Sequence, residues 1–335
     1  MSAALKLFCV ASLGMAGTVY IVLTSAQLPA SQSPATISVA TNQAVAPVVA
    51  SRALSTPPGA AQQSQIQIVA IPPIPTPLVS SEFSGMPAVV TPASATVLSL
   101  PRPMLVRQPR MPAGPIPGVL RLPASEGPFP AVILLHGCNG PFTGMPDWAY
   151  RLNAWGYAAL MPDSMTPRGV KNVCDPADQP KVTPWDRAGD VGAAVTWLRT
   201  KPEIDPARIA VLGLSHGGGT AAILVQTPYA GMRLRAAIDY YGSCIEPRLH
   251  GSVPLLVLAG EADDWGDPAK HCREYGKELR PDQPFEIHTY PGVYHGFDGG
   301  PTTKTVYSGH VMAYDKAAAE DSFVRVRAFL DRQVR

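Results

Sequence analysis

Charged residues are scarce in this chain of 335 residues, and acidic ones are nearly absent from its first third. Only 16% of the residues are charged, the formal net charge is +2, and Glu82 is the only acidic residue before Glu126. Because nucleic-acid binding needs a basic excess that this chain lacks, we expect no nucleic-acid partner. With 46% hydrophobic residues, the chain is also too apolar to be disordered throughout.

The first 26 residues are predicted to direct export. Lys6 supplies a positive start, residues 7–26 carry no charge, and Thr24-Ser25-Ala26 is a small-residue sequence suited to signal cleavage. The uncharged run is 20 residues long. Since about 20 residues cross a bilayer, a retained anchor fits as well as a cleaved signal peptide. Both interpretations place the rest of the chain in the periplasm or outside the cell, and the anchor would tether it to the membrane.

Residues 27–104 are predicted to be a largely disordered linker rich in Pro, Ala and Ser. The run Pro72-Pro73-Ile74-Pro75-Thr76-Pro77 favours an extended chain, because proline cannot donate a backbone hydrogen bond. Low charge and the lack of a sustained period argue against a hydrophobic core. The exception is 66–71, where alternating Gln and Ile allow a short strand. The linker would be either a tether that holds the domain off a surface or a passive spacer.

Residues 105–335 are predicted to form one α/β domain. Apolar runs predict strands at 131–135, 157–161, 208–212, 236–240, 254–259 and 285–290. Helices are predicted at 148–155, 186–199, 216–226, 268–279 and 316–330. Continuous apolar strands between amphipathic helices indicate a mostly parallel sheet covered by helices on both faces. In such sheets the reactive residues lie at the carboxyl ends of the strands.

The first reactive strand end is Gly213-Leu214-Ser215-His216-Gly217, which directly follows a predicted strand and directly precedes a helix. This is the G-x-S-x-G nucleophile elbow in the context that it requires, with glycines that relieve the crowding of a sharp turn. A phosphate-binding turn is the alternative, but the lysine of a nucleotide P-loop is absent. We therefore expect Ser215 to be a nucleophile.

Two further strand ends supply a candidate acid and a candidate base. The strand at 254–259 is followed by three carboxylates: Glu261, Asp263 and Asp264. His295 follows the last predicted strand and is the expected general base, with His310 as a weaker rival. The chain order of serine, acid and histidine is that of the α/β-hydrolases.

The chemistry assigns a role to each group. His295 would take the serine proton and return it to the leaving alcohol. The carboxylate would fix the imidazole tautomer and stabilise the imidazolium. The oxyanion needs preorganised N–H donors, and we expect them from the backbone of His216 and of Cys138, in the loop after the strand at 131–135.

Together these motifs resemble the dienelactone hydrolase family of α/β-hydrolases over residues 105–335. The resemblance lies in the segments 130–138, 213–218, 260–263 and 290–295. It implies the α/β-hydrolase fold. It also singles out Asp263 among the three carboxylates, because the G-x-x-D pattern of the family ends there, and it supports Cys138 and His216 as oxyanion donors.

Two departures from the family bear on the substrate. The members that cleave dienelactone use a cysteine nucleophile where this chain has Ser215. They also have an arginine four residues after the catalytic histidine, where this chain has Gly299. A neutral ester or lactone therefore fits better than dienelactone. Arg168 is left as a candidate for binding an acidic substrate, although a structural role is the better interpretation.

The cysteines fit an exported protein. Removal of a signal peptide leaves four cysteines, an even number: Cys138, Cys174, Cys244 and Cys272. Of the three pairings we favour Cys138–Cys174 and Cys244–Cys272, since each pair joins loops that follow neighbouring strands at the catalytic end of the sheet. The cysteines form no C-x-x-C pair, so we expect no metal site and no other cofactor.

The sequence thus predicts a serine hydrolase that cleaves small-molecule carboxylic esters or lactones through an acyl-enzyme. A peptidase or an acyltransferase on the same fold is an alternative. A catalytically silent envelope interaction module is another. An intact set of Ser215, Asp263 and His295 favours an enzyme over the silent module. The oligomeric state has no signature in the sequence.

Overall fold

The structure is a computed structural model that describes residues 11–13, 19–21, 65–72, 109–141, 145–299 and 302–335. The chain divides into two compact units, Met1–Pro58 and Gly59–Arg335. In the first unit, β1 (Ala11–Leu13) pairs antiparallel with β2 (Val19–Ile21). Among the described residues, no helix is long and apolar enough to span a bilayer. The predicted export segment and linker lie mostly outside the described residues.

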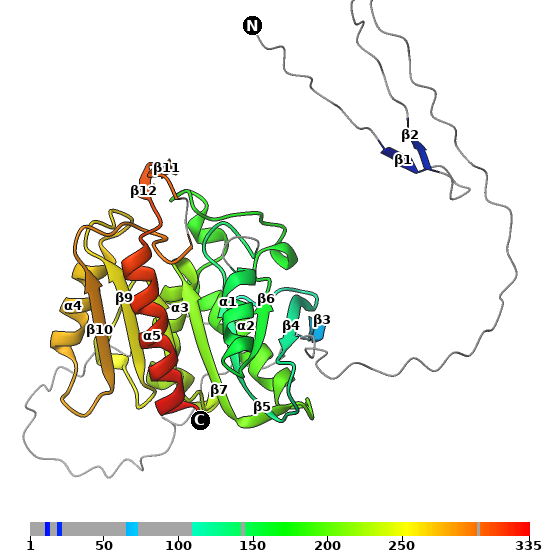
Figure 1. The fold of residues 1–335 in the computed structure, drawn as a ribbon, viewed down its shortest axis with the longest axis horizontal. Coiled ribbons are helices and arrows are strands. Elements are labelled where there is room, and N and C mark those ends of the chain that lie inside the picture. Colours follow the sequence, from blue (N-terminus) through cyan, green and yellow to red (C-terminus); the bar gives the residue numbers. More distant parts are fainter. Residues whose placement is uncertain (1–10, 14–18, 22–64, 73–108, 142–144, 300–301) are drawn as a thin grey trace, which may run out of the picture. The chain divides into compact units, whose positions relative to one another are not determined.

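The second unit is built on one sheet of eight strands in the order β10-β9-β8-β7-β5-β6-β4-β3 (Figure 1). The strands are β3 (Gln65–Ile71), β4 (Ile116–Leu122), β5 (Phe129–Leu135), β6 (Ala158–Pro162), β7 (Ile204–Leu214), β8 (Ala237–Tyr240), β9 (Leu255–Gly260) and β10 (Phe285–Tyr290). The pairs from β10 to β6 are parallel, whereas β4 runs antiparallel to both of its neighbours. This is the predicted α/β-hydrolase arrangement, a mostly parallel central sheet.

The sheet separates two hydrophobic cores because alternate side chains of each strand point to opposite faces. All residues of β5 and β9 are buried, as expected for strands covered on both faces. One core packs against α2 (Pro184–Leu198), α3 (His216–Leu224) and α4 (Pro268–Glu278). The other core packs against α1 (Met145–Ala154) and α5 (Lys316–Gln333). Helices therefore cover both faces.

Helix α2 has a well-defined beginning. The side chain of Thr183 accepts a hydrogen bond from the backbone of Asp186, the Asp186 carboxylate accepts one from the backbone of Thr183, and Pro184 occupies the first turn. The exposed side chain of Arg110 also binds the Asp186 carboxylate, at 2.6 Å. These contacts fix the start of α2, which lies near the carboxyl end of β7, because Thr183 and Trp185 line a hollow together with Ser215.

Three strand pairings were not anticipated in full. β3 lies within the predicted linker and pairs with β4 along its whole length, so the sheet begins earlier in the chain than the domain start expected at residue 105. The pairing of β4 with β6 was not predicted, because β4 contains Pro117 and Gly118, two residue types that are unfavourable in a strand. A hairpin of β11 (Thr305–Tyr307) and β12 (His310–Met312) projects beyond one end of the sheet (Figure 1). All three residues of β11 are exposed, so it shows no alternating pattern of burial.

Candidate active site

Ser215 lies at a sharp turn between β7 and α3. Its backbone has φ 55° and ψ −116°, a conformation that is strained for any residue with a side chain. The Ser215 N–H donates to the carbonyl oxygen of Tyr240 at 2.8 Å, which fixes the turn against β8. A Cβ atom at Gly217 would lie 2.5 Å from the carbonyl oxygen of Leu135, and one at Gly213 would collide with the Gly217 carbonyl. The turn therefore requires its two glycines.

Asp263 and His295 are joined by a buried hydrogen bond. The distance from His295 Nδ1 to Asp263 Oδ2 is 2.7 Å, and the two residues are 3% and 2% exposed. The other oxygen of Asp263 accepts from the backbone N–H of Trp265 at 2.9 Å. Because β9 and β10 are neighbours in the sheet, the loops that follow them bring these two residues together.

The other acidic and basic candidates have different partners. Glu261 binds Arg273 and Thr289 at the surface. Asp264 accepts from the backbone N–H of Val311 and lies 3.5 Å from His310. Of the three carboxylates after β9, the structure brings only Asp263 into hydrogen-bond contact with His295.

Aromatic rings hold the His295 imidazole from two directions. The Tyr241 ring lies 4.6 Å from it, centroid to centroid, and the Trp265 ring lies 4.9 Å from it. Ser215 and His295 line the same pocket, and among the described residues no hydrogen bond joins their side chains. Ser215 and Cys138 also line a second hollow, whose wall includes Trp185.

The two residues expected to stabilise an oxyanion are both near Ser215: Cys138 lines the same pocket, and His216 follows Ser215 in the chain. Cys138 belongs to the loop after β5, and its carbonyl oxygen accepts from the backbone N–H of Val173 at 2.8 Å. His216 is the first residue of α3, where backbone N–H groups have no intrahelical partner. Within the described part of the chain, neither the Cys138 nor the His216 N–H has a hydrogen-bond acceptor. Both donors are therefore free to bind an anion.

A buried arginine, not identified from the sequence, contacts the His216 side chain and the loop that carries Cys138. Arg187 of α2 is fully buried, and its Nη1 donates to His216 Nδ1 at 2.8 Å. Its Nη2 donates to the carbonyl oxygen of His136 at 2.7 Å. Burial, and then the charge of Arg187, lower the pKa of His216 to about 3, so that imidazole is neutral. An arginine near the start of a helix is usually exposed, so the sequence offered no signal for its burial.

The pocket beside His295 is also lined by a partly buried carboxyl group, that of Asp298. Asp298 accepts hydrogen bonds from Tyr241 Oη at 2.6 Å and from Trp148 Nε1 at 2.7 Å, and burial raises the pKa of Asp298. Asp147 and Arg151 also line this pocket.

Arg168, the candidate for binding an acidic substrate, is committed elsewhere. Its two terminal nitrogens each lie 2.8 Å from one oxygen of Asp190, and both side chains are nearly buried. A further bond runs from Arg168 to the carbonyl oxygen of Ser164. The structural role is therefore the one that the contacts support.

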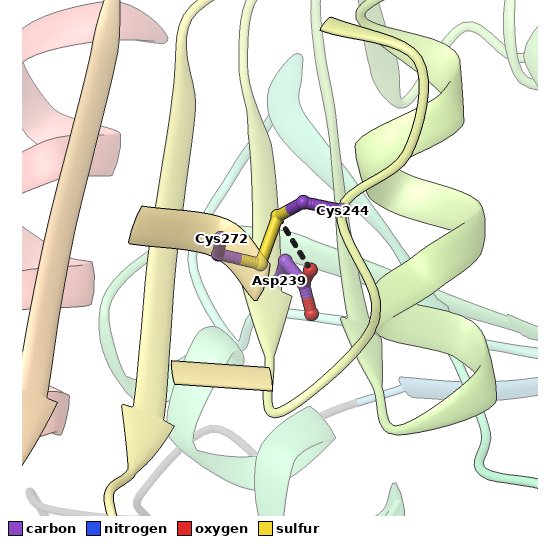
Figure 2. A group of neighbouring side chains, drawn as sticks. All are labelled: Asp239, Cys244 and Cys272. Carbon is purple, nitrogen blue, oxygen red and sulfur yellow. Dashed lines mark hydrogen bonds between the residues drawn. A yellow bond between two sulfur atoms is a disulfide. The ribbon is translucent and has the colours of Figure 1, made fainter. Parts of the chain in front are cut away.

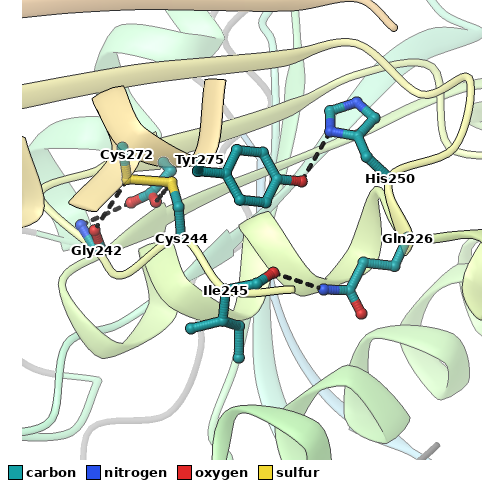
Figure 3. Close-up of a disulfide and its surroundings, with 8 residues drawn as sticks. Gln226, Gly242, Cys244, Ile245, His250, Cys272 and Tyr275 are labelled. Atoms are coloured by element: carbon teal, nitrogen blue, oxygen red, sulfur yellow. Dashed lines mark hydrogen bonds between the residues drawn. A yellow bond between two sulfur atoms is a disulfide. The ribbon is translucent and has the colours of Figure 1, made fainter. Parts of the chain in front are cut away.

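The four cysteines form two disulfides in the pairing favoured from the sequence. Cys138–Cys174 links the loop after β5 to the segment after β6, and Cys244–Cys272 links the loop after β8 to α4. Figure 3 shows this second disulfide beside the hydrogen bonds from Gln226 to Ile245 and between His250 and Tyr275. The loop after β8 is thus held at Cys244 and Ile245.

Asp239, Cys244 and Cys272 are the cluster of described residues whose ligand atoms lie close enough to hold a metal ion (Figure 2). The two sulfurs are bonded to each other, so neither is a thiolate ligand. One carboxylate then remains, which does not make a metal site. Burial raises the pKa of Asp239 to about 7, and Cys244 Sγ lies 3.9 Å from its Oδ2.

Comparisons with known proteins agree with this architecture. The dienelactone hydrolase family matches residues 116–334. A protein described as a dienelactone hydrolase from Klebsiella pneumoniae subsp. pneumoniae has a similar structure, with a TM-score of 0.53 and 21% sequence identity, over 65% of this chain and 93% of that one. A dienelactone hydrolase-like promiscuous phosphotriesterase from metagenomic libraries has a TM-score of 0.54 and 22% identity, over 66% and 94%. At these identities the two structures show the fold.

An uncharacterised protein of Mycobacterium tuberculosis is 34% identical over 99 residues, which cover 23% of this chain and 35% of that protein. This chain therefore spans about a third of the curated relative that it matches.

Proposed function

Because this chain belongs to the dienelactone hydrolase family, we propose that it is a serine hydrolase that cleaves carboxylic esters or lactones through an acyl-enzyme. In this proposal Ser215 is the nucleophile, His295 is the general base and acid, and Asp263 orients the imidazole. The backbone N–H groups of Cys138 and His216 form the oxyanion hole.

One observation carries the proposal. A carboxylate that is 2% exposed accepts a 2.7 Å hydrogen bond from an imidazole in the wall of the pocket that contains Ser215. In this proposal the proton of that bond lies on Nδ1 of His295, and Nε2 is the basic nitrogen. A serine at a strained strand-to-helix turn beside such an imidazole is the arrangement that activates a hydroxyl group.

The charges around Ser215 favour a neutral substrate. Two acidic residues, Asp147 and Asp298, and one arginine, Arg151, line the pocket beside His295. Among the described residues that line the second hollow, on the side of Trp185, there is no aspartate, glutamate, lysine or arginine. Arg168 is bound to Asp190, and Gly299 stands where the resemblance implies a substrate-binding arginine. A substrate carboxylate would therefore find no free cation at the position that the family uses.

The test is hydrolysis of p-nitrophenyl acetate and butyrate by the full chain and by Ser215→Ala. We expect a burst of one p-nitrophenol per active site, an acyl adduct on Ser215 by mass spectrometry, and a loss of kcat of about 10⁶ in the variant. A p-nitrophenyl ester with a free carboxylate on its acyl chain should react more slowly than its neutral counterpart. Equal rates in the folded wild type and the folded variant would contradict the proposal.

The location of the chain is a second part of the proposal. Two disulfides are typical of proteins in an oxidising compartment, and the positively charged start with an uncharged run at 7–26 is typical of an export segment. We propose that the enzyme acts in the periplasm or outside the cell. Mass spectrometry of the chain from cell fractions would show whether it begins after residue 26, as a cleaved signal requires, or keeps that segment in the membrane fraction.

A further inference from the structure

We propose that Arg187 is a positioning residue for the oxyanion hole: its buried guanidinium group holds together the two loops that carry the N–H donors and adds a positive charge behind them. This inference rests on the proposed function, because it assigns a role within the same reaction.

The first argument is the geometry of the two hydrogen bonds. Nη1 of Arg187 binds the imidazole of His216, whose own backbone N–H is one expected oxyanion donor. Nη2 binds the carbonyl oxygen of His136, two residues before the other expected donor, Cys138. A guanidinium group is planar and rigid, so two bonds from one fork fix the two loops relative to each other. The spacing of the two oxyanion donors therefore depends on Arg187.

The second argument is the protonation state of the partners. Arginine can only donate, so His216 Nδ1 must accept and carries no proton. On His136, Nε2 accepts from the backbone N–H of Ser164 at 3.3 Å, and Nδ1 donates to the carbonyl oxygen of Gly137 at 2.7 Å. Burial and the charge of Arg187 lower the pKa of His136. Both imidazoles are therefore neutral, and Arg187 is the one cation in this network.

The third argument is that no carboxylate forms a hydrogen bond with this cation among the described residues. Asp190, one turn along α2, is bound by both terminal nitrogens of Arg168, and Asp186 is bound by Arg110 and Thr183. Nε of Arg187 has no hydrogen-bond partner in the described structure. Burial lowers the pKa of Arg187 to about 9, so the group stays charged at neutral pH.

A buried cation that is not neutralised by contact is expensive to maintain. In a site with little water, however, a fixed positive charge stabilises an anion that develops nearby far more than it would in water. The anion of this reaction forms between the N–H groups of Cys138 and His216. The arrangement therefore acts mainly on the transition state, in which the oxyanion exists, and little on the neutral ester that binds first.

The experiment compares Arg187→Met and Arg187→Lys with wild type, as full chains. Methionine has a side chain of similar length but lacks the charge and both hydrogen bonds. Lysine keeps the charge but cannot bind both loops. We expect kcat to fall about 10²–10³-fold in Arg187→Met, as for the loss of one oxyanion donor, with KM changed less than about threefold. Arg187→Lys should recover part of the loss. The affinity for an alkyl boronic acid, which forms an anionic tetrahedral adduct on serine, should fall in parallel with kcat/KM.

Arg110→Ala is the matched control, because Arg110 contacts the start of the same helix and neither oxyanion loop. It should lower stability and leave kcat unchanged. A folded Arg187→Met with kcat and boronate affinity near wild type would overturn the inference. If that variant does not fold, an unchanged kcat in folded Arg187→Lys would overturn the bridging role. Lack of Ser215-dependent hydrolysis in wild type would instead overturn the proposed function, and this inference with it.

Discussion

Acidic residues that are close in the sequence differ here in what surrounds them. Asp263 is buried and contacts an imidazole, whereas Glu261 and Asp264 lie nearer the surface and bind other groups. The difference follows from the turn after β9, where the backbone N–H of Trp265 binds Asp263 and fixes its direction. An orienting role for a carboxylate depends on that burial, because water would otherwise compete for the imidazole.

We expect Asp263→Asn to lower kcat about 10⁴-fold with little change in KM, because an amide in this position favours the wrong imidazole tautomer. Glu261→Gln and Asp264→Asn are the matched controls, and each should keep kcat within about threefold of wild type. The measurement is steady-state hydrolysis of p-nitrophenyl butyrate by the three variants. A loss in Asp264→Asn comparable to that in Asp263→Asn would reassign the acid.

Asp239 makes stability depend on pH. Burial raises its pKa from the ordinary 3.8 to about 7, so the folded state keeps a proton that the unfolded state releases. The contribution of Asp239 to the free energy of unfolding is complete below pH 4 and is lost as the pH rises through 7. Over that range the free energy of unfolding falls by at most about 1.4 kcal/mol per pH unit.

Asp239→Asn keeps a neutral side chain and an oxygen that can accept from the Gly242 N–H, as Asp239 does now at 2.7 Å. We therefore expect the variant to gain stability relative to wild type between pH 5 and pH 7. The measurement is urea unfolding at several pH values, with the difference in the free energy of unfolding plotted against pH. A difference that is constant with pH would show that Asp239 ionises normally in the fold.

At the scale of elements, two disulfides close loops of similar length, with sequence separations of 36 and 28 residues. In the chain-entropy account both should contribute about 4 kcal/mol to the free energy of unfolding. Their positions differ, because one includes Cys138, whose N–H is an expected oxyanion donor, and the other joins the loop after β8 to α4. Removing each disulfide in turn can therefore distinguish an effect on stability alone from an effect on catalysis.

We expect the double variants Cys138→Ser/Cys174→Ser and Cys244→Ser/Cys272→Ser to lose similar free energies of unfolding. Only the first should also lower kcat, by about tenfold or more, because the loop that holds one oxyanion donor is released. Urea unfolding and esterase kinetics on the same samples are the two measurements. Equal kcat in the two double variants would show that the first disulfide has no part in positioning the donor.

The elements that were predicted from the sequence share a physical feature, which is burial on a regular pattern. The strands β5 and β9 and the second half of β7, from Ile209 to Leu214, are unbroken apolar runs, and the G-x-S-x-G motif identifies its own turn. The burial of Arg187 was not predicted, because the sequence of a helix does not distinguish a buried arginine from an exposed one. Its hydrogen-bond partners, His216 and His136, are 29 and 51 residues away in the sequence. Contacts of that range depend on the assembled fold.

At the scale of the whole molecule, the sheet uses a strand that the sequence separates from the rest of the domain. β3 pairs residue by residue with β4, and its last residue, Ile71, is fully buried in the core that packs against α2. Its neighbour on the other face, Ile68, is 90% exposed. We therefore expect the boundary of the folding unit to be set by the pairing of β3 with β4, rather than by the start of the periodic sequence at residue 105.

We expect a chain shortened to residues 59–335 to match the full chain in stability, and one shortened to residues 105–335 to be less stable and to self-associate. Without β3, β4 becomes an exposed edge and a cavity opens at the position of Ile71. In the full chain, Ile71→Ala isolates the packing loss and should lower the free energy of unfolding by about 2–5 kcal/mol. Ile68→Ala is its control and should change that free energy by less than about 0.5 kcal/mol. Urea unfolding and size-exclusion chromatography measure both effects, and equal stability of the two shortened chains would place the boundary at residue 105 after all.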